Sequence, residues 1–89
     1  MGHQAMLSSK GNGNVAIGTD ALNAAGTCND NVAVGYNAGL TLSDGPGNVL
    51  IGRDAGKLMT TSDYNIAIGF QALDALTTNS HNNLSLIHI

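Results

Sequence analysis

The side chains best suited to metal or proton chemistry in this sequence are its histidines and aspartates. His3, His81 and His88 lie near the two ends of the chain and follow no regular spacing. A metal centre needs several ligands at defined spacing. The sequence offers no such cluster, so we interpret the histidines as solvent-exposed residues and predict no metal and no cofactor.

Three aspartates, Asp30, Asp44 and Asp63, lie in turn-rich segments and are candidates for calcium ligands. They stand at different distances before the next asparagine of the repeat. The chain also lacks the Gly-Gly-x-Gly-x-Asp nonapeptide of calcium-binding β-rolls. Turn stabilisation by Asx hydrogen bonds is therefore the favoured interpretation of these residues.

Glycine-rich segments would bind phosphate only if they carried further motif residues. After Gly11–Asn14, no Gly-x-Gly-x-x-Gly and no Gly-Lys-Ser/Thr motif follows. Lys57 follows Gly56, but Leu58 stands where a magnesium-binding hydroxyl would be needed. Acid–base catalysis by paired carboxylates would need a cleft, which a regular repeat surface does not offer. We predict that the chain is not an enzyme.

Composition and charge limit the partners. The formal net charge is -3 and only 3 residues are basic, which leaves no electrostatic footprint for nucleic acid. The sequence has no run of 18 apolar residues and no signal-peptide pattern, so we predict no membrane span within it. Cys28 is the single cysteine, and we expect it to be an incidental thiol in a loop.

An internal repeat organises the chain, and such a period outweighs local propensity. Four segments share the pattern Asn-[Val/Ile]-[Ala/Leu]-[Val/Ile]-Gly and begin repeats 1 to 4: Asn14–Gly18, Asn31–Gly35, Asn48–Gly52 and Asn65–Gly69. Their starting positions, 14, 31, 48 and 65, differ by 17 residues each time. Each segment continues as x-[Asp/Asn/Gln]-Ala-[Leu/Gly].

Each of these segments is short, β-branched and bounded by a turn former, which predicts a five-residue strand. Val15 and Ile17 would share one face of the strand, while Ala16 would point to the other. Stacked in parallel at about 4.8 Å, like residues would form ladders. The predicted structural site residues are an asparagine ladder and a set of corner glycines: Asn14, Asn31, Asn48 and Asn65, and Gly18, Gly35, Gly52 and Gly69.

The arm that follows each strand contains good helix formers, notably in segments 20–25 and 71–76. A short helical turn is favoured there, with a bent second strand as the alternative. The predicted fold is all-β: a β-solenoid or parallel β-roll of 17-residue repeats, with short helical turns at its corners. Residues 1–83 form one repeat-array domain, which we expect to be truncated at both ends. Residues 84–89 are interpreted as a non-repeat tail, and one hypothesis for it is the translated sequence of a sequencing adapter.

The blocks Asn14–Leu22 and Asn31–Gly39 resemble the YadA-like head repeats of trimeric autotransporter adhesins, and equally the related repeats of phage tail fibres. The resemblance covers roughly residues 2–79. It implies a left-handed parallel β-roll in which three chains assemble into a head that binds host surfaces or extracellular matrix. It also implies a location on the cell surface, outside the cell or in a virion.

The small apolar residues of each repeat offer a single chain little burial, so we expect a parallel homotrimer. Either strand face could meet a neighbouring chain. An Asp at Ile51 would be buried and prevent folding with or without the trimer, whereas an Asp at Ala33 would test whether the alanine face is the interface. The leading function is a structural or adhesive module of a surface or fibre protein. The alternatives are a purely architectural tail-fibre segment and a calcium- or carbohydrate-binding module.

Overall fold

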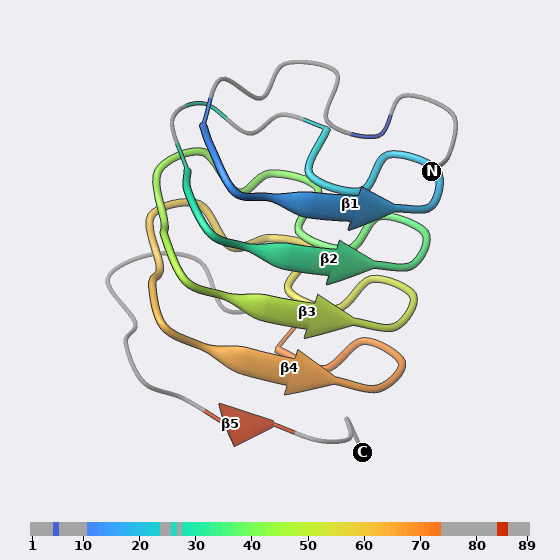
Figure 1. The fold of residues 1–89 in the computed structure, drawn as a ribbon. Coiled ribbons are helices and arrows are strands. Elements are labelled where there is room, and N and C mark those ends of the chain that lie inside the picture. The colour runs from blue at the N-terminus through green and yellow to red at the C-terminus, as the bar shows by residue number, and fades with distance from the viewer. Residues whose placement is uncertain (1–4, 6–10, 24–25, 27, 74–83, 86–89) are drawn as a thin grey trace.

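The computed structural model describes residue 5 and residues 11–23, 26, 28–73 and 84–85. These residues contain five strands and no helix: β1 (Val15–Ile17), β2 (Val32–Val34), β3 (Val49–Ile51), β4 (Ile66–Ile68) and β5 (Leu84–Ser85). All five lie in one sheet in chain order, and every neighbouring pair is parallel (Figure 1). The all-β class and the parallel stacking predicted from the sequence are therefore confirmed.

The register of the sheet follows the 17-residue period. Val15 pairs with Val32, Val32 with Val49, and Val49 with Ile66, so equivalent positions of the repeats lie side by side. The last pair departs from this rule, because Ile66 pairs with Leu84, one residue further along than the period requires. Residues 84–85 thus continue the sheet, while the proposed domain boundary at residue 83 stays a prediction.

Strands β1 to β4 have three residues each rather than the five predicted, because the flanking asparagine and glycine do not take part in the strand pairing. The backbone N–H of Asn31 donates to the side-chain oxygen of Asn14 at 2.9 Å, not to a backbone carbonyl. Asn48 and Asn65 repeat this arrangement. At the other end, φ is +120° at Gly18 and +134° at Gly35, so the chain leaves the strand conformation there.

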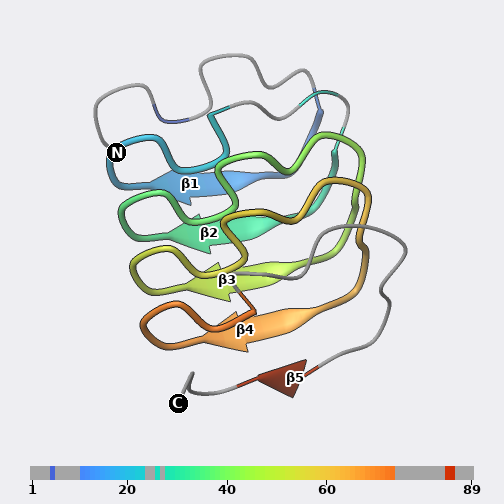
Figure 2. The same ribbon diagram turned by 180° about the vertical axis from the view of Figure 1, so that it is seen from behind.

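The core lies on the alanine face of the strands. The middle residues of β1 to β4 are buried, and the chain passes behind them on its way to the next strand (Figure 2). The alanine that follows each corner is also fully buried, as at Ala21 and Ala38. The prediction that either strand face could meet a neighbouring chain is wrong for this face, because it already packs inside a single chain.

The predicted helical turn is wrong for the described part of the arm. Ala21 donates to Gly18 and Asn23 to Asp20, both at 3.2 Å, so two successive tight turns replace a helix. Asp20 and Leu22 have φ values of +60° and +51°, and a right-handed helix cannot pass through left-handed residues. Residues 24–25 and 74–76 of the predicted helical segments lie outside the described residues.

The same alternation explains the pattern x-[Asp/Asn/Gln]-Ala-[Leu/Gly] of the sequence. In every repeat the residue before and the residue after this alanine have positive φ: Asp20 and Leu22, Asn37 and Gly39, Asp54 and Gly56, and Gln71 and Leu73. Glycine adopts this conformation at no steric cost, and Asp and Asn tolerate it. The residue before each repeat's asparagine is left-handed as well: Gly13, Asp30, Gly47 and Tyr64.

Large and small residues compensate one another in the core. Leu50 is the one middle-strand residue of β1 to β4 that is not alanine, and it is fully buried. A Cβ placed on Gly39 would lie 2.9 Å from Leu50, and one on Gly56 would lie 2.8 Å from it. Repeats 1 and 4 reverse the sizes, with alanine in the strand and Leu22 or Leu73 in the turn. The glycines therefore make room for Leu50.

Candidate interaction surface

The outer face of the sheet is apolar. Each of the strands β1 to β4 points two β-branched side chains away from the core, because strand side chains alternate between the two faces. In β1 these are Val15 and Ile17, which are 46% and 44% exposed. We call the whole set the aliphatic face: Val15, Ile17, Val32, Val34, Val49, Ile51, Ile66 and Ile68.

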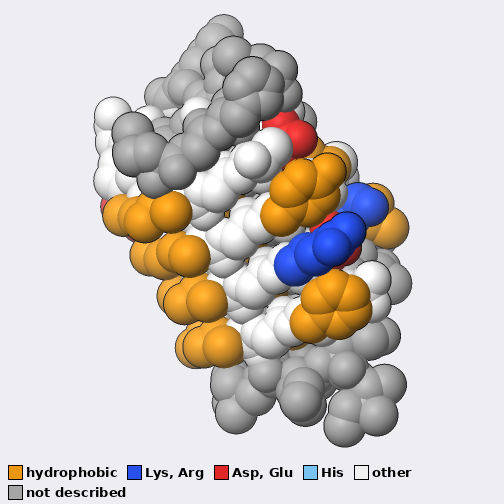
Figure 3. Space-filling view, turned by 90° about the vertical axis from the view of Figure 1, so that its right-hand side faces the viewer, with side chains coloured by type: hydrophobic (Ala, Val, Ile, Leu, Met, Phe, Trp, Pro, Cys, Tyr) orange, Lys and Arg blue, Asp and Glu red, His pale blue; other side chains and the backbone are white. Residues whose placement is uncertain are grey.

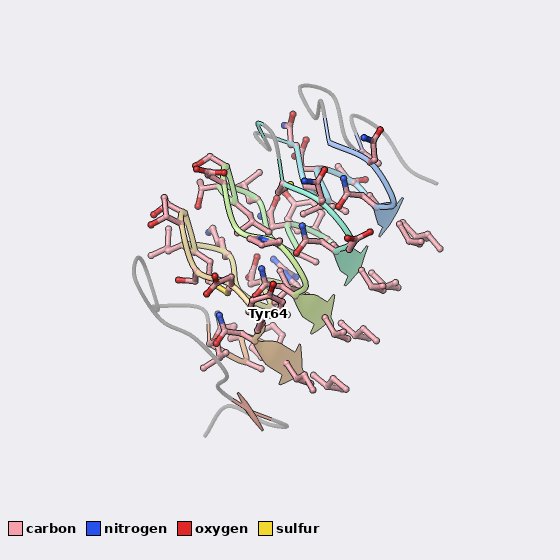
Figure 4. The ribbon with its side chains drawn as sticks, turned by 60° about the vertical axis from the view of Figure 1, so that its left-hand side comes forward. Tyr64 is labelled. Atoms are coloured by element: carbon pink, nitrogen blue, oxygen red, sulfur yellow. The ribbon has the colours of Figure 1, made fainter. Side chains whose placement is uncertain are left out.

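The aliphatic face is continuous across the repeats. Figure 3 shows its side chains as one apolar column along the molecule, and Figure 4 shows side chains that project outward from the strands. Equivalent residues of neighbouring strands lie about 4.8 Å apart in a sheet, so no polar group interrupts the column. Contiguous apolar patches of this kind are typical of contact surfaces, whereas single exposed apolar side chains are common on any protein.

The asparagine ladder fixes the start of each strand that carries this face. The amide oxygen of Asn14 accepts from the backbone N–H and from Nδ2 of Asn31, and Asn48 and Asn65 continue the series. Three of the four, Asn31, Asn48 and Asn65, are fully buried. The structure thus brings these predicted site residues together inside the molecule, where they hold the register and cannot meet a partner.

The corner glycines fix the end of each strand. A Cβ on Gly18 would lie 2.8 Å from the backbone carbonyl of Gly35, and one on Gly35 would lie 2.6 Å from the carbonyl oxygen of Gly52. Gly52 faces Gly69 in the same way at 2.5 Å. All four glycines have positive φ between +120° and +134°. Neighbouring backbones approach so closely here that a side chain does not fit.

A second exposed column follows the corner glycines, and the sequence analysis did not identify it. We call Thr19, Tyr36, Arg53 and Phe70 the corner column. Their backbones stack, since Asn37, Asp54 and Gln71 donate to the carbonyls of Thr19, Tyr36 and Arg53 at 3.0, 2.8 and 2.8 Å. Tyr36 is 47% exposed and Phe70 is 58% exposed. A 17-residue alignment of the sequence would have placed these four residues in one column.

Arg53 connects the corner column electrostatically. Its guanidinium carbon lies 5.3 Å from the centroid of the Tyr36 ring, which is a cation–π contact. Its Nε lies 3.7 Å from Oδ2 of Asp54, whose side chain is 11% exposed against 64% for Arg53. The other carboxylate oxygen, Oδ1 of Asp54, is buried without a hydrogen-bond partner. The charge that faces solvent at this corner is therefore the guanidinium.

The three aromatic residues of the chain are all exposed. Besides Tyr36 and Phe70, Tyr64 lies two residues before β4 (Figure 4) and is more than half exposed. In repeat 4 all four of the large apolar residues Tyr64, Ile66, Ile68 and Phe70 are exposed. The core is filled by alanine, leucine, Met59 and Cys28 instead, so the aromatic rings lie on the surface.

The other predicted residues lie away from these columns or outside the described residues. Asp30 and Asp44 are exposed and Asp63 is half-buried, and no group of three metal-binding side chains occurs in the part of the chain that the structure describes. Cys28 lies between strands, as expected for a loop residue, but its side chain is only 1% exposed and belongs to the core. Its equivalents in repeats 2 and 3 are Gly45 and Ser62, so the position favours small residues. His3, His81 and His88 lie outside the described residues.

Within the described ranges, no helix is long and apolar enough to cross a membrane. Neither family models nor curated proteins nor solved structures gave a match to this chain.

Proposed function

We propose that this chain is a structural and adhesive repeat module of a bacterial surface protein or phage fibre, built as a β-solenoid of the parallel β-roll type with one 17-residue repeat in each coil. The observation that carries the proposal is the uniform outer face of the sheet. Four repeats in strict register each present two β-branched side chains outward. A surface that repeats in this way suits lengthwise assembly better than recognition of one small substrate.

The partner for the aliphatic face is two further copies of the same chain. Every outward position of β1 to β4 is valine or isoleucine; those of β1 and β4 are exposed in a single chain and those of β2 and β3 are half-buried. Removing this surface from water stabilises an assembly by roughly 25 cal/mol per Å². A threefold axis parallel to the stack would bring three equivalent aliphatic faces together, with like repeats at the same height. This arrangement is a parallel homotrimer, for which the resemblance to adhesin heads is the further support.

Light scattering coupled to size exclusion tests the trimer on the 89-residue chain. The unmodified chain is expected to have three times the monomer mass at micromolar concentration. The substitution Ile17→Asp places a charge on the aliphatic face and should reduce the mass to that of a monomer, because an unpaired carboxylate would be buried between chains. Leu58→Asp is the matched control, since Leu58 is 45% exposed but lies outside this face. A folded, unmodified monomer would refute the trimer.

The second candidate is a purely architectural segment of a virion tail fibre, with receptor binding elsewhere on the protein. The same stacked repeats and aliphatic face support it, because a spacer needs assembly but no ligand. The flanking sequence discriminates between the two. A membrane-anchor β-barrel with a coiled-coil stalk favours the adhesin, and a self-cleaving chaperone domain favours the fibre. In either case we infer a location at a cell surface, outside the cell or in a virion.

A further inference from the structure

We propose that the corner column binds a linear acidic glycan that lies along the stack. The inference rests on the proposed adhesive function, because it names the class of ligand that such a module would bind. It starts from the alternation of Tyr36, Arg53 and Phe70, in which an exposed cation stands between two exposed aromatic rings. Figure 3 shows this basic and apolar column separated from the aliphatic column by a strip of uncharged atoms.

The geometry suits an extended ligand. Tyr36 and Phe70 belong to repeats 2 and 4, so their backbones are two rungs apart, or about 9.6 Å. Successive pyranose rings of an extended glycan advance by roughly one rung of a parallel sheet. Two alternate sugar rings can therefore lie against Phe70 and against the part of the Tyr36 ring that the Arg53 guanidinium leaves exposed, while the sugar between them lies at Arg53. No cavity is found in the described structure, and a flat column of this kind requires none.

The chemistry of the column favours sugars with carboxylate groups. The apolar C–H face of a pyranose ring packs against aromatic side chains, which supply large contact area at low entropic cost. The guanidinium of Arg53 can pair with a carboxylate through charge-assisted hydrogen bonds. The nearby carboxylate of Asp54 is 11% exposed, so it does not present a competing negative charge at the surface.

The same features argue against nucleic acid as the ligand. Strips that bind single-stranded nucleic acid combine aromatic rings with a track of many positive charges along the backbone. Here the corner column carries one cation, and the chain as a whole has a net charge of -3. A single sugar carboxylate can instead be held by this one cation, because the flanking aromatic rings bind the uncharged faces of the neighbouring sugars.

The test is calorimetric titration of the 89-residue chain with a hexameric oligogalacturonate, with cellohexaose as an uncharged ligand of similar shape. The acidic hexamer should bind, and the neutral one should bind several-fold more weakly. Arg53→Gln should weaken binding by about fivefold and Arg53→Lys by less, because lysine keeps the charge but not the planar group. Tyr36→Leu combined with Phe70→Leu should weaken binding of both hexamers. Leu58→Gln, at an exposed apolar position outside the column, should change neither.

Three results would overturn the inference. The first is equal binding by the unmodified chain and by the triple variant Tyr36→Leu/Arg53→Gln/Phe70→Leu. The second is equally tight binding of a single-stranded oligonucleotide, which would mean that the column takes any polyanion. The third is a lower assembly mass for the aromatic variant, which would make the corner column a contact between copies. Light scattering on the same samples separates the two proposals, because a trimer that binds no glycan removes only this inference and a glycan-binding monomer removes only the trimer.

Discussion

The amide oxygen of Asn31 accepts two hydrogen bonds from Asn48, one from the backbone N–H at 2.7 Å and one from Nδ2 at 3.0 Å. Both residues are fully buried. Nδ2 of Asn48 also donates to the carbonyls of Gly45 at 3.1 Å and Ser62 at 3.0 Å. The side chain must therefore be an acceptor on one atom and a donor on the other, and only a primary amide of this length satisfies both neighbours.

The substitution Asn48→Asp preserves the shape of this side chain but removes its donors. A carboxylate would face the carbonyls of Gly45 and Ser62, and we expect a loss of about 3 kcal/mol or more in the free energy of unfolding at neutral pH. Burial raises the pKa of the introduced carboxyl in the folded state above its value in the unfolded chain. The folded state then binds more protons, so stability should fall as the pH rises above about 4.

Urea denaturation at several pH values measures this effect. Asn12→Asp is the control, because Asn12 is exposed and its side chain makes none of these contacts. A flat pH profile for Asn48→Asp, equal to that of the control, would show that the ladder does not determine stability.

The corner glycine Gly35 should not tolerate alanine. Its φ is +134° and a Cβ would lie 2.6 Å from the carbonyl oxygen of Gly52, so both strain and a backbone clash oppose the substitution. Gly13→Asn is the matched comparison, since Gly13 has a φ of +74° and the atom nearest to a new Cβ is the flexible carboxylate end of Asp30. We expect Gly35→Ala to lower the thermal midpoint far more than Gly13→Asn. Equal midpoints would contradict the role assigned to the corner.

The strands could be predicted from the sequence because a 17-residue period without insertions forces equivalent residues into register. The arm after each strand could not. Asp20–Asn23 has good helix propensity, but the left-handed φ values at Asp20 and Leu22 follow from stacking on the next repeat, where Asn37 bonds to Thr19 and Leu22 to Ala38. Local propensity contains no information about such contacts between repeats.

Which face of the strands packs in the core could also not be predicted from the sequence. Alternation shows that Ala33 and Val34 lie on opposite faces, and hydrophobicity alone favours the larger residue for the core. The structure reverses this choice, because the coil interior must also hold Ala38 and Leu42 and has room only for small side chains at most strand positions. The corner column was missed for a related reason, since its four members share a position but no residue type.

Ala33→Asp should therefore prevent folding, rather than act as a probe of the interface. Ala33 is fully buried within one chain, and an aspartate there would place an unpaired carboxylate in the core. Ile51 lies on the aliphatic face, so Ile51→Asp should lower the assembly mass while the strand content is retained. Circular dichroism together with light scattering distinguishes the two outcomes. Normal strand content in Ala33→Asp would mean that this face is not the interior.

The buried position of Cys28 predicts slow thiol chemistry. An aromatic disulfide reagent should react with Cys28 much more slowly in the folded chain than in denaturant, because the side chain is 1% exposed. Cys28→Ser should lower the free energy of unfolding by no more than about 1 kcal/mol, since Ser62 occupies the equivalent place in repeat 3. Cys28→Met should cost about 1–3 kcal/mol through overpacking. Rapid modification under native conditions would place the thiol outside the core.

The size exchange between Leu50 and Gly56 predicts strong coupling between two core positions. Leu50→Ala removes a fully buried side chain and should cost about 2–5 kcal/mol. Gly56→Leu should also destabilise, because a new Cβ would lie 2.8 Å from Leu50 and 2.7 Å from Met59.

The double variant Leu50→Ala/Gly56→Leu gives repeat 3 the combination already present in repeat 1, where Ala16 and Leu22 occupy the same two places and Leu22 has a φ of +51°. The introduced leucine should fill the space that Leu50 leaves, with a remaining clash at Met59. We therefore expect the double variant to be more stable than the sum of the single changes predicts, by about 1–3 kcal/mol in a denaturation cycle. Pairing Leu50→Ala with Leu58→Ala, at an exposed position, should give additive changes. Additivity for the Leu50 and Gly56 pair as well would show that the two residues do not share one volume in the core.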